Sequence, residues 1–320
     1  MGSLVTPTDP ALRNGADRPY RRAEMAQDTV IKSRSRIAAY VALTKPRIIE
    51  LLLVTTVPTM VVAERGMPSL WLILVTLVGG TLAAGGANAV NMYIDRDIDR
   101  LMKRTRRRPL VTGEIAPRNA LVFALGLEVA AFVELWLLVN PLSALLAMSA
   151  TLFYVFVYTI WLKRTSSSNI VIGGAAGAVP VLVGWAAVTG SLGLAPLVLF
   201  AIIFYWTPPH FWALAIRYRE DYAAADVPML PVVTSFAATA RRIVIYTVVL
   251  WAVSLLFWPV GGMGHLYLAS AIVLGGIFTW HATQLARHGT PERAMRLFGW
   301  SITYVTLLFS AMAIDQLLPR

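Results

Sequence analysis

The chain reads LWLILVTLVGGTLAAGGANAVNMYIDRDID at residues 70–99. Residues 70–92 carry no charged side chain, and roughly 20 such residues are enough for a helix to cross a bilayer. Three aspartates follow directly, at Asp95, Asp97 and Asp99. The stretch therefore predicts a membrane-spanning helix that ends in acidic side chains at the membrane surface.

Similar apolar stretches recur along the 320 residues, of which 57% are hydrophobic and 14% charged. Soluble chains usually have about 25% charged residues, so this composition indicates a polytopic membrane protein. The sequence contains no cysteine, which excludes disulfides and cysteine-ligated metal centres. We expect an all-α integral membrane bundle of about nine transmembrane helices, at residues 46–63, 70–92, 119–139, 141–161, 170–188, 196–218, 242–259, 265–286 and 297–317.

Residues 1–45 combine Pro, Asp, Arg and Ser without apolar periodicity. A segment of this kind cannot bury enough apolar surface to fold. We therefore expect a mostly disordered N-terminal tail, followed by one nine-helix domain over residues 46–320.

Lysine and arginine are distributed unevenly between the predicted spans. Of the 28 Lys and Arg residues, all but Arg65 and Arg320 fall in five alternate segments: 1–47, 93–118, 162–169, 217–242 and 287–296. Because such loops stay on the cytoplasmic side, this predicts a cytoplasmic N-terminus and an external C-terminus. The net charge of +11 then reflects topology and attraction to anionic lipids of the bilayer, and we expect no nucleic-acid partner.

The acidic motif has a helical spacing. If the helix continues past the membrane, Asn91, Asp95 and Asp99 lie at about 0°, 40° and 80° on one face, and Asp97 points away. An amide and two carboxylates form an oxygen ligand set suited to Mg²⁺ bridging a diphosphate. Lys103, Arg104 and Arg108 follow and can neutralise the remaining phosphate charge. The alternative is a solvated, salt-bridged loop whose arginines only set topology.

A second unusual segment, WTPPHFW at residues 206–212, lies within a predicted span. Adjacent prolines are tolerated there where the helix lines a cavity or packs on neighbours. His210 at membrane depth is either functional or a packed histidine bonded to a carbonyl. Shifting the chain by 122 residues aligns Asp99 with Asp221, so an internal repeat would bring two acidic loops together at the cytoplasmic surface.

These motifs resemble the UbiA superfamily of intramembrane prenyltransferases. The resemblance covers roughly residues 40–315, and the segment around His210 with PMLP at 228–231 is similar to the haem-modifying branch. It implies a helical bundle around a central cavity open toward the cytoplasmic side, in a bacterial cytoplasmic membrane. It also implies Mg²⁺-dependent transfer of farnesyl from farnesyl diphosphate to a vinyl group of haem b, giving haem O and diphosphate for haem-copper oxidases. A haem A synthase or oxidase assembly factors are implied as transient partners.

The resemblance also implies roles for particular side chains. The metal ligands and catalytic residues would be Asn91, Asp95, Asp99 and Asp221. The residues that bind diphosphate would be Lys103, Arg104, Arg108, Lys163, Arg164 and Arg217. His210 would hold the haem iron or a propionate, with Lys45 and Arg47 as alternative propionate partners.

Two other functions stay open at this point. The same chemistry could act on a quinone precursor or chlorophyllide. A transporter could also bind anions with acidic and basic clusters at helix ends, but its acids should lie near the membrane midplane. Asp95, Asp99 and Asp221 are predicted at the cytoplasmic surface instead.

Overall fold

The structure is a computed structural model that describes residues 34–319, except for the side chains of residues 47, 48 and 50–53. Residues 1–33 of the predicted tail therefore lie outside the described residues. The prediction of disorder is wrong for the end of that segment, because Arg36–Thr44 form helix α2. Ser35 caps this helix by accepting a hydrogen bond from the Ala38 amide, and Ala39 and Leu43 bury one face.

The described range contains eight helical runs long and apolar enough to cross a membrane. They are α4 (Leu70–Ile94), α7 (Pro117–Leu138), the run of α8 (Pro141–Leu152), η2 (Phe153–Leu162) and α9 (Lys163–Thr165), α10 (Asn169–Thr189), α11 (Leu194–Arg217), α14 (Phe236–Val260), α15 (His265–His288) and α16 (Pro291–Leu317). Helix α3 (Pro46–Glu64) adds a further 19-residue helix, of which Val54–Glu64 is an apolar part within the fully described residues. The predicted all-α membrane fold is confirmed, and each predicted span overlaps one of these helices.

The helix boundaries follow from local chemistry. Pro117, Pro141 and Pro291 stand in first turns, where a missing amide donor costs nothing. Between α7 and α8, the Asn140 side chain accepts from the Ser143 amide at 2.9 Å and donates to the Ala186 carbonyl at 2.8 Å. This cap ends one span and starts the next within two residues.

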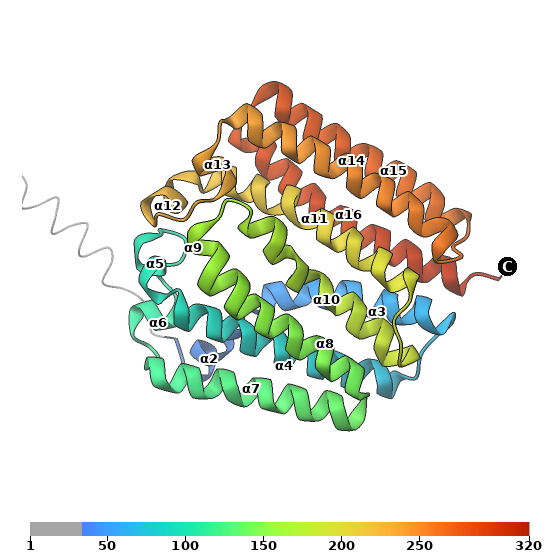
Figure 1. Ribbon diagram of the computed structural model, residues 1–320, viewed down its shortest axis with the longest axis horizontal. Coiled ribbons are helices and arrows are strands. Elements are labelled where there is room, and N and C mark those ends of the chain that lie inside the picture. Colours follow the sequence, from blue (N-terminus) through green and yellow to red (C-terminus); the bar gives the residue numbers. More distant parts are fainter. Residues whose placement is uncertain (1–33, 320) are drawn as a thin grey trace, which may run out of the picture.

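Two groups of helices pack on either side of α3 and α10 (Figure 1). One group contains α4, α7, α8 and η2, and the other contains α11, α14, α15 and α16. The short helices α5 (Arg96–Leu101), α6 (Pro109–Thr112), α12 (Arg219–Ala224) and α13 (Leu230–Val233) lie at one end of the bundle (Figure 1). The charged loops predicted to be cytoplasmic are therefore gathered at a common surface.

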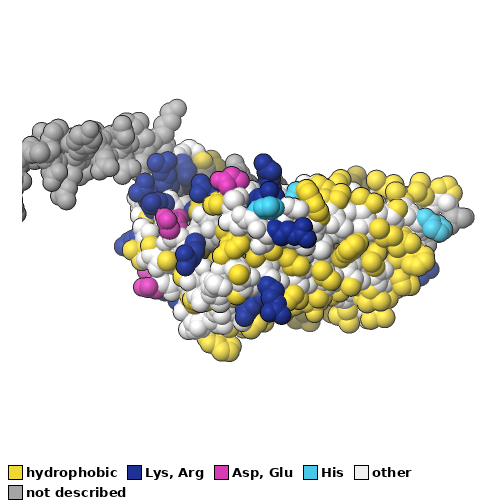
Figure 2. Space-filling view, turned by 90° about the horizontal axis from the view of Figure 1, so that it is seen from above, with side chains coloured by type: hydrophobic (Ala, Val, Ile, Leu, Met, Phe, Trp, Pro, Cys, Tyr) yellow, Lys and Arg dark blue, Asp and Glu magenta, His cyan; other side chains and the backbone are white. Residues whose placement is uncertain are grey.

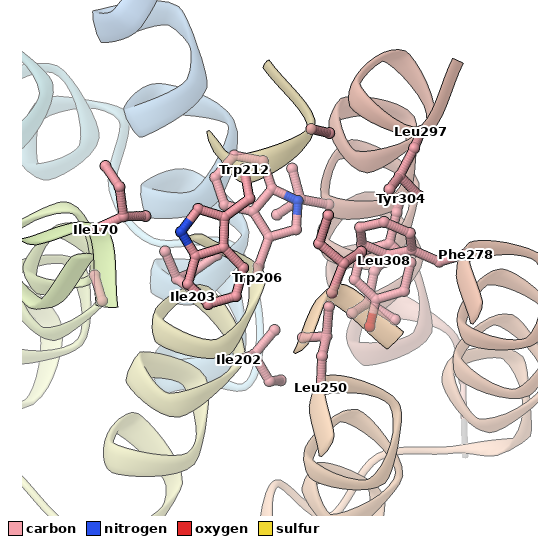
Figure 3. Close-up of a cluster of buried hydrophobic side chains, with 14 of the residues drawn as sticks. Ile170, Ile202, Ile203, Trp206, Trp212, Leu250, Phe278, Leu297, Tyr304 and Leu308 are labelled. Carbon is pink, nitrogen blue, oxygen red and sulfur yellow. The ribbon is translucent and has the colours of Figure 1, made fainter. Parts of the chain in front are cut away.

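The distribution of apolar side chains is that of a membrane protein. Trp206, Trp212 and Tyr304 belong to the buried core of the second group (Figure 3), while large apolar residues such as Val129 and Trp161 are exposed on the outside. Figure 2 shows Lys and Arg concentrated toward the end that carries α5 and α12, with apolar side chains covering most of the remainder. The chain is thus a multi-pass membrane protein.

Candidate active site

The acidic motif lies where α4 ends. The helix breaks at Asp95 and resumes as α5, but the Asp95 amide donates to the Asn91 carbonyl and the Asp99 amide to the Asp95 carbonyl, both at 2.9 Å. These bonds keep the helical register across the break. Asn91, Asp95 and Asp99 are therefore all buried, Asp95 with 0% exposure, whereas the Asp97 side chain is 59% exposed. The structure gives this motif the facing predicted from its spacing.

Positive side chains from three separate segments meet the buried face. Lys163 of α9 pairs with Asp95, and Arg108 Nη1 lies 2.6 Å from Asp99 Oδ2. Lys45, between α2 and α3, donates to Asn91 Oδ1 at 2.7 Å. Burial, with the nearby charges of Arg108 and Lys163, lowers the pKa of Lys45 well below its usual value. A partly buried group with this much positive charge is suited to binding an anion.

The orientation of the Asn91 amide is fixed by η2, a π-helix. The Thr159 hydroxyl donates to the Tyr154 carbonyl at 2.8 Å, so its oxygen accepts from Asn91 Nδ2 at 3.1 Å. Asn91 Nδ2 also donates to Asp95 Oδ2 at 2.8 Å. Both amide hydrogens are then used, and Oδ1 is directed to Lys45. Thr159 is a site residue that the sequence did not predict, because no sequence pattern predicts the π-helix that contains it.

Arg164 is engaged mainly by the outward aspartate. Its Nη1 and Nη2 lie 2.7 and 2.8 Å from the two carboxylate oxygens of Asp97. This hydrogen bonding is the main reason why the pKa of Asp97 falls to about 2. Nη2 also donates to the Ile94 carbonyl at 3.3 Å and lies 3.7 Å from Asp95 Oδ1. Arg164 therefore holds α9 against the break between α4 and α5, beside the buried acids.

The second acidic loop contacts the first, as the internal repeat predicted. Asp221 Oδ2 accepts from the Arg104 amide at 3.0 Å. The Arg104 guanidinium carbon lies 5.7 Å from the ring centre of Tyr218 and 6.0 Å from that of Tyr222. Lys103 and Arg217 are exposed and form no ion pair with the side chains that the structure describes, and the Arg47 side chain lies outside them.

The predicted metal ligands are only partly assembled. Within residues 34–319, no three His, Cys, Asp or Glu side chains form a group that could hold a metal ion, so Asp221 does not join Asp95 and Asp99 in one set. Asp95 Oδ1 is nevertheless buried without a hydrogen bond. A buried carboxylate oxygen without a hydrogen bond is the kind of ligand that a hard cation such as Mg²⁺ prefers, so the Asp95 side chain fits a metal ligand.

His210 lies apart from this group, between α11 and α16. It is 7% exposed, and its ring stacks on Trp206 and Phe298 with centroid distances of 4.3 and 4.5 Å. Nδ1 lies 2.7 Å from the Ser301 hydroxyl oxygen. The histidine is thus held by a serine side chain, not by the carbonyl considered from sequence.

Comparison with known proteins agrees with this fold. Residues 52–309 match the UbiA prenyltransferase family. The chain is 57% identical to a protoheme IX farnesyltransferase from Clavibacter michiganensis subsp. michiganensis, over 88% of this chain and 93% of the relative. It is 53% identical to one from Parafrankia sp., over 94% and 99%.

Solved structures share the fold at low sequence identity. A digeranylgeranylglyceryl phosphate synthase superposes with a TM-score of 0.73 at 17% identity, over 88% of this chain and 99% of that one. A UbiA homologue from Archaeoglobus fulgidus bound to GPP and Mg²⁺ superposes with a TM-score of 0.57 at 18% identity, over 86% and 99%. The chain belongs to the UbiA prenyltransferase family, a class of membrane-embedded enzymes.

Proposed function

We propose that the chain transfers the farnesyl group of farnesyl diphosphate to a vinyl group of haem b, yielding haem O and diphosphate. The observation that carries this proposal is the identity of 53–57%, along about nine tenths of the chain, to relatives named protoheme IX farnesyltransferase. The positively charged group around Asp95 and Asp99 supports the donor half of the reaction, since it can bind a diphosphate.

We assign the metal ligands to Asn91, Asp95, Asp99 and Asp221. Mg²⁺ would supply positive charge between these oxygens and the diphosphate, and polarise the bond to the prenyl carbon. Asp221 is included because its loop rests on Arg104 of the first loop. Chelation of Mg²⁺ should therefore stop turnover. Activity that persists in excess chelator would show that the reaction does not need the metal.

The basic residues bind the departing diphosphate in this scheme. Lys163 and Arg108 each hold a carboxylate, so their positive charge is already in place before the bond breaks, and Lys45 donates to the Asn91 amide oxygen beside them. Because Lys45 contacts the acidic motif, we assign it to diphosphate and not to a haem propionate. Arg164 and the exposed side chains of Lys103, Arg104 and Arg217 complete the basic set.

The acceptor half of the reaction rests on His210, which we assign to haem. Trp206 and Phe298 stack on its ring, so it lies in apolar surroundings that suit a macrocycle. The allylic cation that forms when the diphosphate departs must be protected from water, which a site among apolar membrane helices provides. The haem vinyl group attacks that cation, which forms the new C–C bond and moves the positive charge to the carbon beside the ring. Water adds at that carbon and releases a proton to solvent, which leaves a hydroxyethylfarnesyl chain.

One assay tests the proposal directly. Purified protein in detergent is incubated with farnesyl diphosphate, Mg²⁺ and haem b. The molecular mass of the extracted pigment is then measured by mass spectrometry. Parallel reactions contain a quinone precursor or chlorophyllide as acceptor. A farnesylated haem is the expected product. Formation of a prenylated quinone precursor, with haem left unchanged, would show that the acceptor is the quinone precursor and not haem.

We further propose that the chain lies in a bacterial cytoplasmic membrane with its N-terminus in the cytoplasm. The uneven distribution of Lys and Arg supports this orientation. This orientation would expose the acidic loops to cytoplasmic farnesyl diphosphate. Haem O would then be delivered through transient contact with a haem A synthase or oxidase assembly factors.

A further inference from the structure

His210 is enclosed on both faces of its ring. Trp206, four residues earlier on α11, stacks on one side at an interplanar angle of 22°, and Phe298 of α16 stacks at 28°. Phe211 meets the ring edge-on, with centroids 5.0 Å apart. A flat macrocycle therefore cannot stack on this imidazole, and any ligand must reach a ring nitrogen from the edge.

Proton counting around Ser301 decides which nitrogen is available. The Ser301 hydroxyl lies 2.6 Å from the Phe298 carbonyl, which can only accept, so the hydroxyl proton is directed there. The same oxygen is 2.7 Å from His210 Nδ1 and must accept from it. Nδ1 therefore carries the proton of the neutral imidazole, and Nε2 carries the lone pair.

Ser301 also fixes where the ring stands. Its backbone carbonyl accepts from Trp206 Nε1 at 2.7 Å, so one residue of α16 holds two stacked rings of α11. Among the described side chains, Ser301 is the hydrogen-bond partner of His210, which leaves Nε2 unengaged by them. A ring held by a donor bond at one nitrogen, with the other nitrogen bare, is the usual arrangement of a metal-ligating histidine.

We propose that Ser301 is a positioning residue that holds His210 in the Nδ1-protonated form and so presents Nε2 to the iron of the haem acceptor. The inference rests on the proposed function. It also chooses between two roles for His210, since a lone pair on Nε2 binds a metal ion but repels a propionate carboxylate.

The first test needs no haem. The chain has four histidines, and ¹⁵N-histidine NMR of the full-length protein in detergent resolves the two tautomers, with His210→Gln assigning the signal. The expected result is a protonated Nδ1 in the native protein and in Ser301→Thr, which keeps the hydroxyl. Ser301→Ala should populate both tautomers. A protonated Nε2 in the native protein would overturn the proposal without bearing on farnesyl transfer.

The second test uses haem b itself. Resonance Raman spectra of the ferrous complex should show an iron–histidine stretch in the native protein and Ser301→Thr that His210→Gln abolishes. Ser301→Ala should weaken haem binding about tenfold or more, as loss of a partner behind a metal ligand commonly does. Farnesyl diphosphate affinity and the unfolding temperature, measured on the same samples, should stay close to native.

The outcomes separate the inference from the proposed function. An iron–histidine stretch that survives His210→Gln overturns the role of Ser301 and His210, while farnesylated haem in the activity assay still supports the reaction. Equal losses of haem affinity in Ser301→Thr and Ser301→Ala would also overturn it, since the hydroxyl would then be irrelevant.

Discussion

Asp95 and Asp97 are two residues apart and have opposite surroundings. Asp95 is enclosed, pairs with Lys163 and keeps one oxygen without a hydrogen bond. Asp97 is mostly exposed, and both its oxygens are bound by Arg164. The sequence predicted this division from helical spacing alone, because the hydrogen bonds of the helix continue through Asp95.

The carboxylates should therefore differ sharply in catalysis. Asp95→Asn or Asp99→Asn should lower kcat/KM by about 100-fold or more, since each removes a carboxylate that we assign to the Mg²⁺ that neutralises the diphosphate. Asp97→Asn should stay within about threefold, because an exposed ion pair contributes little. Farnesyl transfer assays on all three variants, with unfolding temperatures recorded alongside, check this. Equal loss in Asp97→Asn would contradict the assignment by helix face.

At the scale of elements, the chain contains two similar units. Helices α4 and α5 are separated at Asp95, and α11 and α12 at Tyr218, each with ψ near zero at the break (1° and 26°). In both units the break is followed by a second short helix and then by a long helix. These are α6 and α7 in the first unit, and α13 and α14 in the second. This common order supports the repeat predicted from a few matched residues, and explains why Asp99 and Asp221 both stand just past a break.

The π-helix is the element on which the Asn91 amide depends. Thr159→Val keeps the size of the side chain but removes the oxygen that accepts from Asn91 Nδ2. We expect the Mg²⁺ concentration for half-maximal activity to rise about tenfold, as for other losses behind a metal ligand. Thr165→Val is the matched control, because its exposed hydroxyl bonds only the Trp161 carbonyl. Similar Mg²⁺ dependence in both variants would exclude this role for Thr159.

Asp315 near the end of α16 caps a neighbouring helix. Its carboxylate accepts from the amides of Gly264 and Tyr267, at the start of α15. Asp315→Ala should reduce stability by about 1–3 kcal/mol, because buried amide donors lose their acceptor. Asp315→Asn, which keeps one acceptor oxygen, should lose less. Thermal unfolding in detergent measures both, and identical unfolding of Asp315→Ala and the native protein would show that the cap contributes nothing.

The sequence predicted the elements better than it predicted their details. Long apolar runs identify spans because no other structure satisfies the backbone inside a bilayer. Helix α2 was missed because nine residues with two buried side chains give little periodic signal. The stacking of His210 depends on Phe298 of α16, and the contact of Thr159 depends on Asn91 of α4. Both partners are far away in sequence, so no local pattern predicts these contacts.

On the scale of the whole molecule, charge and apolar surface are separated along the bundle. The Lys and Arg side chains gather toward the end with the short helices, where the acidic motif also lies (Figure 2). Placing that end in the cytoplasm agrees with the rule that loops rich in Lys and Arg stay on the cytoplasmic side. The site would then be reached from the compartment on one side of the bilayer.

Helix α10 offers the sharpest test of this orientation, because exposed residues stand just before and after it. Thr165 precedes its N-terminus and Ser191 follows its C-terminus, and both become cysteine with little change in size. The chain has no cysteine of its own, so labelling reports only the introduced thiol. In inside-out vesicles an impermeant maleimide should modify Thr165→Cys but not Ser191→Cys, and right-side-out vesicles should give the reverse. The opposite pattern would invert the molecule and place the acidic loops outside, while labelling of both positions from one side would mean that α10 does not cross the membrane.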